Sequence, residues 1–232
     1  MNRILLKNHP HIKEYNKIRM IHNEIIDNMA SYYDSGKFSL KFKSDPEHMK
    51  DNIGSNAKPL DISALSYSFD INSDTDSTTY YDMAIYKCAP NATSITEEYL
   101  TKHRFKNPEK IEMLEAMQNS YLGLFEITSA DMQTAYVNLR DVFTGKEFTI
   151  IDTGLCMQMT FDEYLYLRVI TYREVSFVTG LVFIFLKKDS FIKTFIKNEK
   201  KDFDPTDEFS RYIKLYNRYS KYAEVDVMRR EY

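Results

Sequence analysis

Tyrosine, asparagine and arginine alternate with apolar residues along two short segments in the second half of the chain. Such alternation places the polar side chains on one face of a β-strand. Aromatic rings beside guanidinium groups can stack nucleic acid bases or contact a protein partner. The alternative is that helices pack over this face and the tyrosine hydroxyls reach polar groups at its edge. The candidate binding residues are Tyr136 and Arg140 in the first segment, which share this face with Asn138, and Tyr164, Tyr166 and Arg168 in the second.

A second candidate surface is a lysine-rich segment that follows these strands. Residues Lys187–Lys201 contain six lysines and two acidic residues, Asp189 and Glu199, which gives a local charge of +4. Lys193 and Lys197 have the spacing of neighbours on one face of a helix. A basic helix face can contact phosphate groups or an acidic partner, although the solvated face of an ordinary amphipathic helix has the same composition.

Residues that bind metals or act as nucleophiles are sparse. Cys88 and Cys156 are the two cysteines and form no CxxC pair, so the sequence predicts no structural zinc site. Cys156 has no base beside it in the sequence and is interpreted as a small apolar residue of the β region. His9 and His11 are expected in a surface loop, and His22 is expected to be partly buried in a helix. We therefore expect no metal, no cofactor and no catalytic residue.

The composition is that of a folded domain. The 232 residues are 43% hydrophobic, and 31 basic against 34 acidic residues give a formal net charge of −3. This balance argues against binding of nucleic acid over the whole surface, but not against a local basic patch. The longest apolar run, Leu181–Leu186, is far shorter than the roughly 20 residues of a membrane-spanning helix, and the first residues do not resemble a signal peptide. We expect a cytoplasmic protein with reduced thiols and no membrane contact.

Five segments in the middle of the chain have the pattern of β-strands. The last of them is almost continuously apolar, so we expect it to be buried on both faces. Thr144-Gly145 predicts a hairpin turn, because glycine adopts a positive φ without steric cost. Short turns between the segments predict a small antiparallel sheet or a partly open barrel over roughly residues 122–186. The expected strands are Leu122–Thr128, Ala135–Val142, Glu147–Ile151, Tyr164–Tyr172 and Val175–Leu186.

Helices are expected on both sides of this β region, which makes the fold class α+β. Apolar residues recur every three or four positions over residues 11–34 and predict a long amphipathic helix. Ser94 begins a capping-box pattern, and Asn107, followed by proline, predicts the start of a further helix. Ser190–Lys200 is predicted to be a short basic helix, and Asp204, again followed by proline, to begin the last one.

The domain organisation is less clearly marked than the elements. Within the N-terminal part, residues 37–62 are expected to form a loop and residues 63–87 have no clear pattern. We expect one cooperative unit built from three parts. These parts are a helical and irregular segment at 1–92 that packs on the rest, a helix plus an antiparallel β module at 93–200, and a C-terminal helix at 201–232.

A run of turn and core residues resembles one module of uncharacterised bacterial proteins. The matching residues are Asn119-Ser120, the strand Leu124–Ile127 and the hairpin Leu139–Ile150, with its Leu-Arg-Asp start and Thr-Gly turn. Some members of that group stand beside the SEC-C zinc motif, a short Cys/His cluster implicated in protein and ribosome contact. This chain has no such cluster, so the resemblance implies a helix-plus-β module and no zinc site. Residues 160–163 depart from the pattern at the start of a later strand.

These observations favour a non-catalytic binding or scaffold module for a macromolecular partner, which is an unidentified protein or nucleic acid. The alternatives are an enzyme whose site lies in an unrecognised cleft, and a nucleic-acid-binding protein of a mobile element or defence system. The predicted partner surfaces are the Tyr/Arg strand faces and the basic helix. Nothing in the sequence indicates the oligomeric state.

Overall fold

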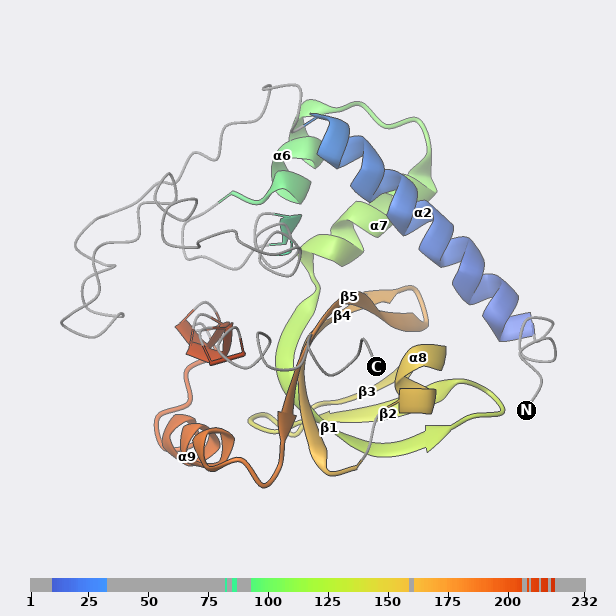
Figure 1. Ribbon diagram of the computed structural model, residues 1–232. Coiled ribbons are helices and arrows are strands. Elements are labelled where there is room, and N and C mark those ends of the chain that lie inside the picture. The colour runs from blue at the N-terminus through green and yellow to red at the C-terminus, as the bar shows by residue number, and fades with distance from the viewer. Residues whose placement is uncertain are drawn as a thin grey trace, which may run out of the picture. The chain divides into compact units, whose positions relative to one another are not determined.

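The computed structural model in Figure 1 describes residues 10–32, 82, 85, 86, 93–158, 161–205, 208, 210–212, 214–216, 218 and 219. The chain divides into two compact units. The first contains residues 10–27 and 105–203, and the second contains the other described residues. The predicted loop at 37–62 lies outside the described residues, as do His9, Cys88 and all of 63–87 except Asp82, Ile85 and Tyr86.

Five strands of the first unit form a closed barrel: β1 (Tyr121–Asp131), β2 (Tyr136–Asp141), β3 (Glu147–Ile151), β4 (Glu163–Tyr172) and β5 (Val175–Leu186). Their order is β1-β2-β3-β5-β4, and β4 pairs again with β1. All pairs are antiparallel except β3 with β5, which are parallel and paired at Ile150 and Ser176. The α+β class and the five-stranded β module are thus confirmed. The barrel is closed rather than partly open, because β5 bridges β3 and β4.

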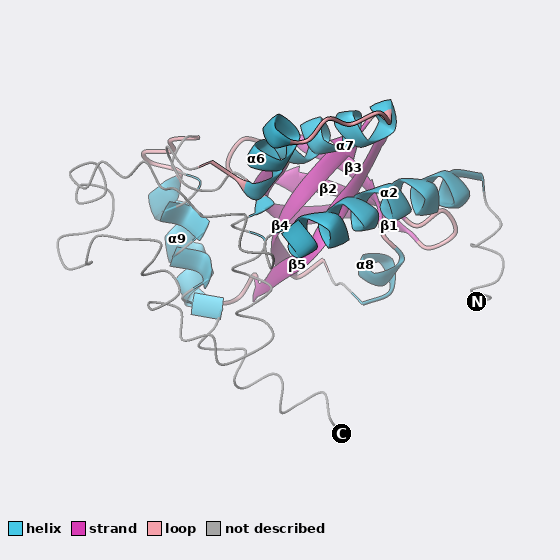
Figure 2. Ribbon diagram, turned by 90° about the horizontal axis from the view of Figure 1, so that it is seen from above, coloured by secondary structure: helices cyan, strands magenta, loops and turns pink. Residues whose placement is uncertain are grey.

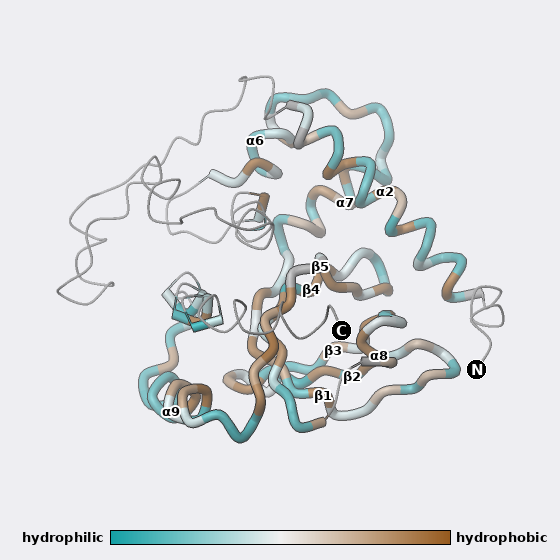
Figure 3. The backbone as a smooth tube through the Cα atoms, viewed as in Figure 1, coloured by the Kyte–Doolittle hydropathy of each residue, from teal (hydrophilic) through white to brown (hydrophobic). Residues whose placement is uncertain are grey.

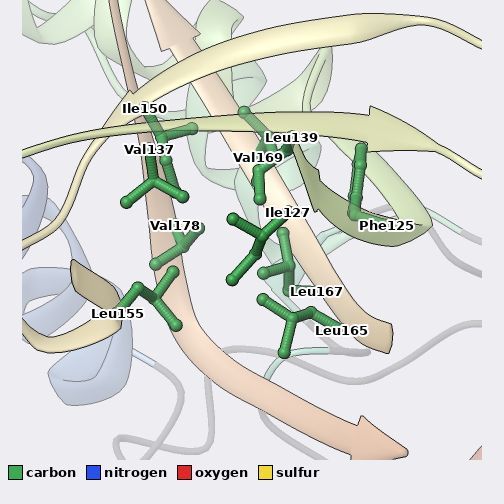
Figure 4. Packing of buried hydrophobic residues seen from close by; sticks show 10 residues of the cluster. All are labelled: Phe125, Ile127, Val137, Leu139, Ile150, Leu155, Leu165, Leu167, Val169 and Val178. Atoms are coloured by element: carbon green, nitrogen blue, oxygen red, sulfur yellow. The ribbon is translucent and has the colours of Figure 1, made fainter. Parts of the chain in front are cut away.

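Alternate residues of the strands fill the barrel interior, as the period of two requires. Leu155 joins them from α8 (Thr153–Gln158), a short helix between β3 and β4 that the sequence pattern did not predict. The carboxylate of Asp152 accepts a hydrogen bond from the backbone N–H of Leu155 at 2.8 Å and so satisfies a donor of its first turn. Figure 4 shows the interior cluster, which consists of Phe125, Ile127, Val137, Leu139, Ile150, Leu155, Leu165, Leu167, Val169 and Val178.

The outer face of the barrel is also buried along β4 and β5. Ile170, Phe177 and Phe183 alternate with interior residues and are nevertheless at most 1% exposed. Two helices, α2 (Pro10–Tyr32), of which residues 10–27 belong to the first unit, and α7 (Pro108–Gln118), lie along this side, as Figure 2 shows from above. The expectation that Val175–Leu186 is buried on both faces is therefore confirmed at Phe177, Val178, Phe183 and Phe185, whereas Leu186 at its end is 46% exposed.

Helix α7 is attached to the turn between β4 and β5. Arg173 in that turn donates from Nε and Nη2 to Oε2 of Glu112 at 2.9 and 2.7 Å, and the hydroxyl of Tyr172 donates to the same oxygen at 3.3 Å. Arg173 has a φ of +54°, a conformation that non-glycine residues rarely adopt. These contacts fix the position of the helix over β4.

Helix α2 packs where β3 and β5 meet. Ile12 is buried in a small cluster with Ala135 and Ile151, and the ring of His22 meets the ring of Phe177 edge-on at 5.4 Å. Only 3% of His22 is exposed, so it is more deeply buried than the sequence suggested. Burial and the nearby charge of Arg19 lower the pKa of His22 to about 4, so the imidazole is neutral at pH 7.

Arg19 connects α2 directly to the backbone of β5. Its Nη1 donates to the carbonyl oxygen of Val178 at 2.8 Å, and its guanidinium lies 5.2 Å from the centre of the Phe177 ring. Val178 is two residues beyond Ser176, the β5 residue that pairs with β3. The arginine thus supplies a hydrogen-bond donor close to the point at which the β3–β5 pairing ends.

The hairpin between β2 and β3 is organised by one buried carboxylate. Oδ1 of Asp141 accepts hydrogen bonds from the backbone N–H groups of Phe143 and Thr144 at 2.9 and 2.7 Å, and from the Thr144 hydroxyl at 2.9 Å. Gly145 completes the turn with a φ of +72°, and its N–H donates to the carbonyl of Asp141 at 3.0 Å. The predicted turn at Thr144-Gly145 is therefore confirmed. A Cβ on Gly123 would lie only 2.5 Å from the other Asp141 oxygen, which explains the glycine beside this carboxylate.

Local capping signals predicted the helix starts well. The hydroxyl of Ser94 accepts from the N–H of Glu97 at 3.1 Å and begins α6 (Ile95–Lys102), which belongs to the second unit. Asn107 accepts from the N–H of Glu109 at 2.9 Å and begins α7. Asp189 caps α9 (Ser190–Glu199), and the described residues from 208 to 219 are helical, as the Asp-Pro signal predicted.

We predict that Gly145→Val destabilises the protein by about 2 kcal/mol, because a β-branched residue resists a positive φ. No atom lies within 4 Å of the position that a new Cβ would take, so the cost arises in the backbone alone. Gly145→Asn is the matched control, since asparagine tolerates this conformation better than valine does. Urea denaturation measures both variants, and an unchanged midpoint for the valine variant would contradict the assignment of the turn.

We also predict that stability falls as the pH drops from about 6.5 towards 4. The pKa of His22 is lower in the folded protein than in the unfolded chain, so the unfolded state binds the proton first. The effect is absent above pH 7 and amounts to roughly 3 kcal/mol at most, from about 1.4 kcal/mol for each pH unit. Denaturation between pH 5 and 8 should show a steeper loss for the wild type than for His22→Gln. Parallel pH profiles of the two proteins would contradict the burial of a neutral histidine.

Candidate binding surfaces

Two of the three β4 residues in the predicted Tyr/Arg surface are buried. Tyr166 is 3% exposed and its ring stacks on Phe183 at 6.1 Å, and Arg168 is 1% exposed and donates from Nη1 to the hydroxyl of Ser120 at 3.2 Å. The alternative that helices pack over this face applies here, because α7 lies against β4. Both side chains are thus buried in this structure, and the expectation that they contact a partner stays a prediction.

Tyr164, the third candidate on β4, lies at the margin of the covered side and is half-buried. The ammonium group of Lys187 lies 5.3 Å from the centre of its ring. Burial raises the pKa of the Tyr164 hydroxyl, and the negative charge of Glu126 raises it further. The hydroxyl therefore stays protonated at neutral pH and remains a hydrogen-bond donor.

No helix of the described residues covers the middle of β2, and the surface there extends across three strands. Asn138 is at its centre, between Ser129 of β1 and Thr149 of β3. The Nδ2 of Asn138 donates to the Ser129 hydroxyl at 2.7 Å, and its Oδ1 accepts from the Thr149 hydroxyl at 2.6 Å. Ser129 and Thr149 are exposed to solvent. We call Ser129, Asn138 and Thr149 the polar ladder.

An ion pair continues this face beside the polar ladder. Nε and Nη2 of Arg140 donate to Oε1 of Glu126 at 2.9 and 2.6 Å, and Nζ of Lys187 lies 3.5 Å from the other Glu126 oxygen. Burial opposes ionisation of Glu126, but the hydrogen bonds and charges of Arg140 and Lys187 outweigh it and lower the pKa of the carboxyl group. Arg140 is half-exposed at 50% of its side chain, so the pair is accessible to a partner.

Tyr136, at the start of β2, is partly withdrawn from this face. Its ring stacks on the imidazole of His11 at 4.9 Å with an angle of 18° between the planes. His11 also contacts the carbonyl of Thr134, so it is anchored in α2. The expectation that His11 lies in a surface loop is wrong, because the helix begins one residue before it and packs on the β1–β2 turn.

The basic helix presents its lysines to solvent. In α9, Ile192 and Phe195 are buried, and the Phe195 ring meets the Phe143 ring of the β2–β3 turn at 6.1 Å. Lys193 and Lys197 are both exposed on the opposite side. Figure 3 shows this division of α9 into a hydrophobic and a hydrophilic side.

The sequence pattern identified some residues of each surface but not all of them. Ser129, Thr149 and Glu126 join the β2 face through the strand register, which alternation within one strand cannot give. Lys200 and Lys201 lie within the predicted lysine-rich segment Lys187–Lys201, directly after the end of α9, and are exposed as well.

Cys156 lies on α8 rather than on a strand. Its side chain is half-buried against the interior cluster, and Sγ lies 3.6 Å from the carbonyl of Tyr136 and 3.7 Å from that of Asp131. Burial raises the pKa of the thiol, and the charges of Asp152 and Asp131 add to this effect. These surroundings disfavour the thiolate, the form in which cysteine attacks substrates or binds metals.

Among the described residues, the His, Cys, Asp and Glu side chains form no group of three or more that could hold a metal ion. Across the same ranges, every helix is too short or too polar to cross a membrane.

Comparisons with known proteins place the chain in a family without assigning an activity. A search of curated proteins and a search of solved structures each gave no match. A family model matches residues 9–227, which include the whole barrel and the helices around it. The chain therefore belongs to the family of unknown function DUF7986.

Proposed function

We propose that the protein is a non-catalytic binding module that contacts a macromolecular partner through the outer face of β1, β2 and β3. The observation that supports this proposal is the unequal covering of the barrel. Phe177 and Phe183 on the outside of β5 are at most 1% exposed, whereas Ser129, Arg140 and Thr149 on β1 to β3 are exposed. A sheet face that carries ordered polar groups and is covered by no helix of the described residues is available to a partner.

The polar ladder is preorganised for hydrogen bonding. Asn138 is held from both sides, so its amide has a fixed orientation before a partner arrives. Ser129 accepts one hydrogen bond and keeps its own O–H donor, and Thr149 donates one and keeps its acceptor lone pairs. A surface with fixed donors and acceptors loses less conformational entropy on binding than a flexible one.

Two analogies support the same surface. Five-stranded Greek-key barrels include the OB-fold, in which the face of strands 2 and 3 binds oligonucleotides and oligosaccharides. The resemblance of Leu139–Ile150 to a module found beside the SEC-C motif also suggests contact with a macromolecule. Fold analogy alone does not assign a function, so the proposal rests on the uncovered face. We also propose a cytoplasmic location, where the thiol of Cys156 remains reduced.

Site-specific photocrosslinking in cells tests this proposal. A benzoylphenylalanine residue at Thr149 or at Glu147 places the crosslinker on the uncovered face, and the same residue at Lys13 of α2 is the control on another exposed surface. We expect one discrete adduct of the same mass from both barrel positions and none from Lys13. Asn138→Ala should reduce its yield severalfold, because the polar ladder loses its central amide.

The result that opposes the proposal is equally specific. Identical adducts from Thr149, Glu147 and Lys13 would indicate non-specific encounters. The absence of any discrete adduct from both barrel positions would show that this face has no stable partner.

A further inference from the structure

An ammonium group lies against two aromatic rings at the end of the barrel where β1 and β3 begin. Nζ of Lys146 is 4.5 Å from the centre of the Tyr121 ring and 4.7 Å from the centre of the Phe148 ring. The centres of the two rings are 5.2 Å apart, and their planes are tilted by 40°. We call Tyr121 and Phe148 the aromatic clamp. We propose that the aromatic clamp binds a quaternary ammonium group, which displaces the ammonium group of Lys146.

The two rings are held by the β2–β3 turn and by the barrel interior. The hydroxyl of Tyr121 lies 3.1 Å from Oγ1 of Thr144, and Oγ1 in turn donates to Oδ1 of Asp141 at 2.9 Å. The Phe148 ring meets the ring of Phe125 edge-on at 5.7 Å, and Phe125 is 0% exposed. Both clamp residues are half-buried, so the protein holds them while part of each remains at the surface. A site whose rings are already in position loses less entropy on binding.

The contacts of Lys146 distinguish a quaternary ammonium group from other cations. Within the described residues, its Nζ donates no hydrogen bond and has no carboxylate within ion-pair distance, so the clamp offers ring faces alone. A primary ammonium group brings three N–H donors and a guanidinium group brings five. Donors that leave water without finding an acceptor cost free energy. A quaternary ammonium group carries the same charge and no N–H, and aromatic rings are its usual partners in proteins.

A buried carboxylate lies beside the aromatic clamp. Asp141 is 3% exposed, and its Oδ1 accepts hydrogen bonds from Phe143 and Thr144, whereas no described residue donates to its Oδ2. A Cβ on Gly123 would lie 2.5 Å from Oδ2 and 2.9 Å from Cε1 of Tyr121, so the carboxylate is close to the edge of this ring. No cationic side chain of the described residues lies within ion-pair distance of Asp141. Its negative charge therefore adds to the attraction of a cation by the rings.

Lys146 shows that the aromatic clamp accommodates a cation, and its side chain can also leave. The side chain is exposed, and its flexible stem allows the ammonium group to move into solvent. A single cation–π contact at an exposed site is weak. The lysine is therefore an internal competitor that a ligand of suitable chemistry can displace.

This inference goes beyond the proposed function and does not depend on it. The rings of the aromatic clamp pack against the barrel interior, whereas the polar ladder lies on the outer face. The clamp is tested with defined small ligands, so failure of the crosslinking experiment would leave it unaffected.

A nuclear magnetic resonance titration of the isotope-labelled, full-length chain with choline tests the inference. We expect saturable shifts for the amides of Tyr121, Thr144, Lys146 and Phe148. The neutral tert-butyl analogue of choline, in which carbon replaces the nitrogen, is the matched ligand control. It has the same shape without the charge, so it should bind at least severalfold more weakly.

Two further ligands distinguish the source of the quaternary ammonium group. These are a short peptide that contains trimethyllysine and the same peptide with unmodified lysine. Tighter binding of the methylated peptide than of choline would support the inference with a protein as the source. Binding of choline but of neither peptide would support it with a small molecule as the source.

Removal of the internal competitor gives the sharpest prediction. Lys146→Met should strengthen choline binding about three- to sixfold, because an exposed cation–π contact of ordinary strength no longer competes. Lys193→Met removes the same charge from an exposed position on α9 and should leave the affinity unchanged. Phe148→Leu removes one ring and should abolish saturable binding, with circular dichroism as the check that this variant is folded. Lys146 is exposed, so its variant tests the inference even if Phe148→Leu does not fold.

Three outcomes would overturn the inference. The first is the absence of saturable shifts at the aromatic clamp with choline and with the methylated peptide, in both the wild type and Lys146→Met. The second is equal affinity for choline and its neutral analogue, which would show that the charge is not recognised. The third is unchanged or weaker binding by Lys146→Met, which would show that the lysine does not occupy the binding site.

Discussion

The barrel depends on a short seam at which β3 and β5 run parallel. Only the pair Ile150 and Ser176 joins these two strands, whereas β4 and β5 are paired along nearly their whole lengths. Closure is favourable because it leaves no exposed sheet edge. The helix α2 supports the seam from outside, through Arg19 on the Val178 carbonyl and through His22 on Phe177. Without α2, the Val178 carbonyl of β5 would lose the hydrogen bond that it accepts from Arg19.

The same helix decides which faces of the barrel are free. Because α2 and α7 lie over β4 and β5, the outward residues there are large and apolar, such as Phe177 and Phe183. Among the described residues, no helix lies over Asn138 and Thr149 on the opposite strands, and these outward polar residues bond to one another. The polar face of β1 to β3 and the exposed lysines Lys193 and Lys197 of α9 are thus separate surfaces of one unit, and each has its own chemistry.

Much of the fold could be predicted because its signals are local. The caps at Ser94 and Asn107 and the positive φ of Gly145 depend on a few neighbouring residues. Such local signals could not predict which of the two Tyr/Arg faces is buried and which is exposed. Arg140 and Arg168 have similar strand patterns, yet Arg140 is half-exposed and Arg168 is buried. The reason is that β4, unlike the middle of β2, lies under α7, which precedes β4 by some 50 residues in sequence. Short α8 was missed as well, since six residues give too little periodicity.

Residue-resolved hydrogen exchange on the wild type and on Arg19→Met tests the importance of the seam most directly. A hydrogen bond from a charged donor stabilises by about 1.5–3 kcal/mol, which corresponds to roughly 10- to 100-fold in an opening equilibrium. The variant should therefore show that acceleration for amides of β5 near Ser176 and Val178 and of β3 near Ile150. Amides in the β1–β2 ladder should change much less, because their partners do not involve α2. Equal acceleration of all strands, or none at the seam, would contradict the view that α2 supports the closure of the barrel.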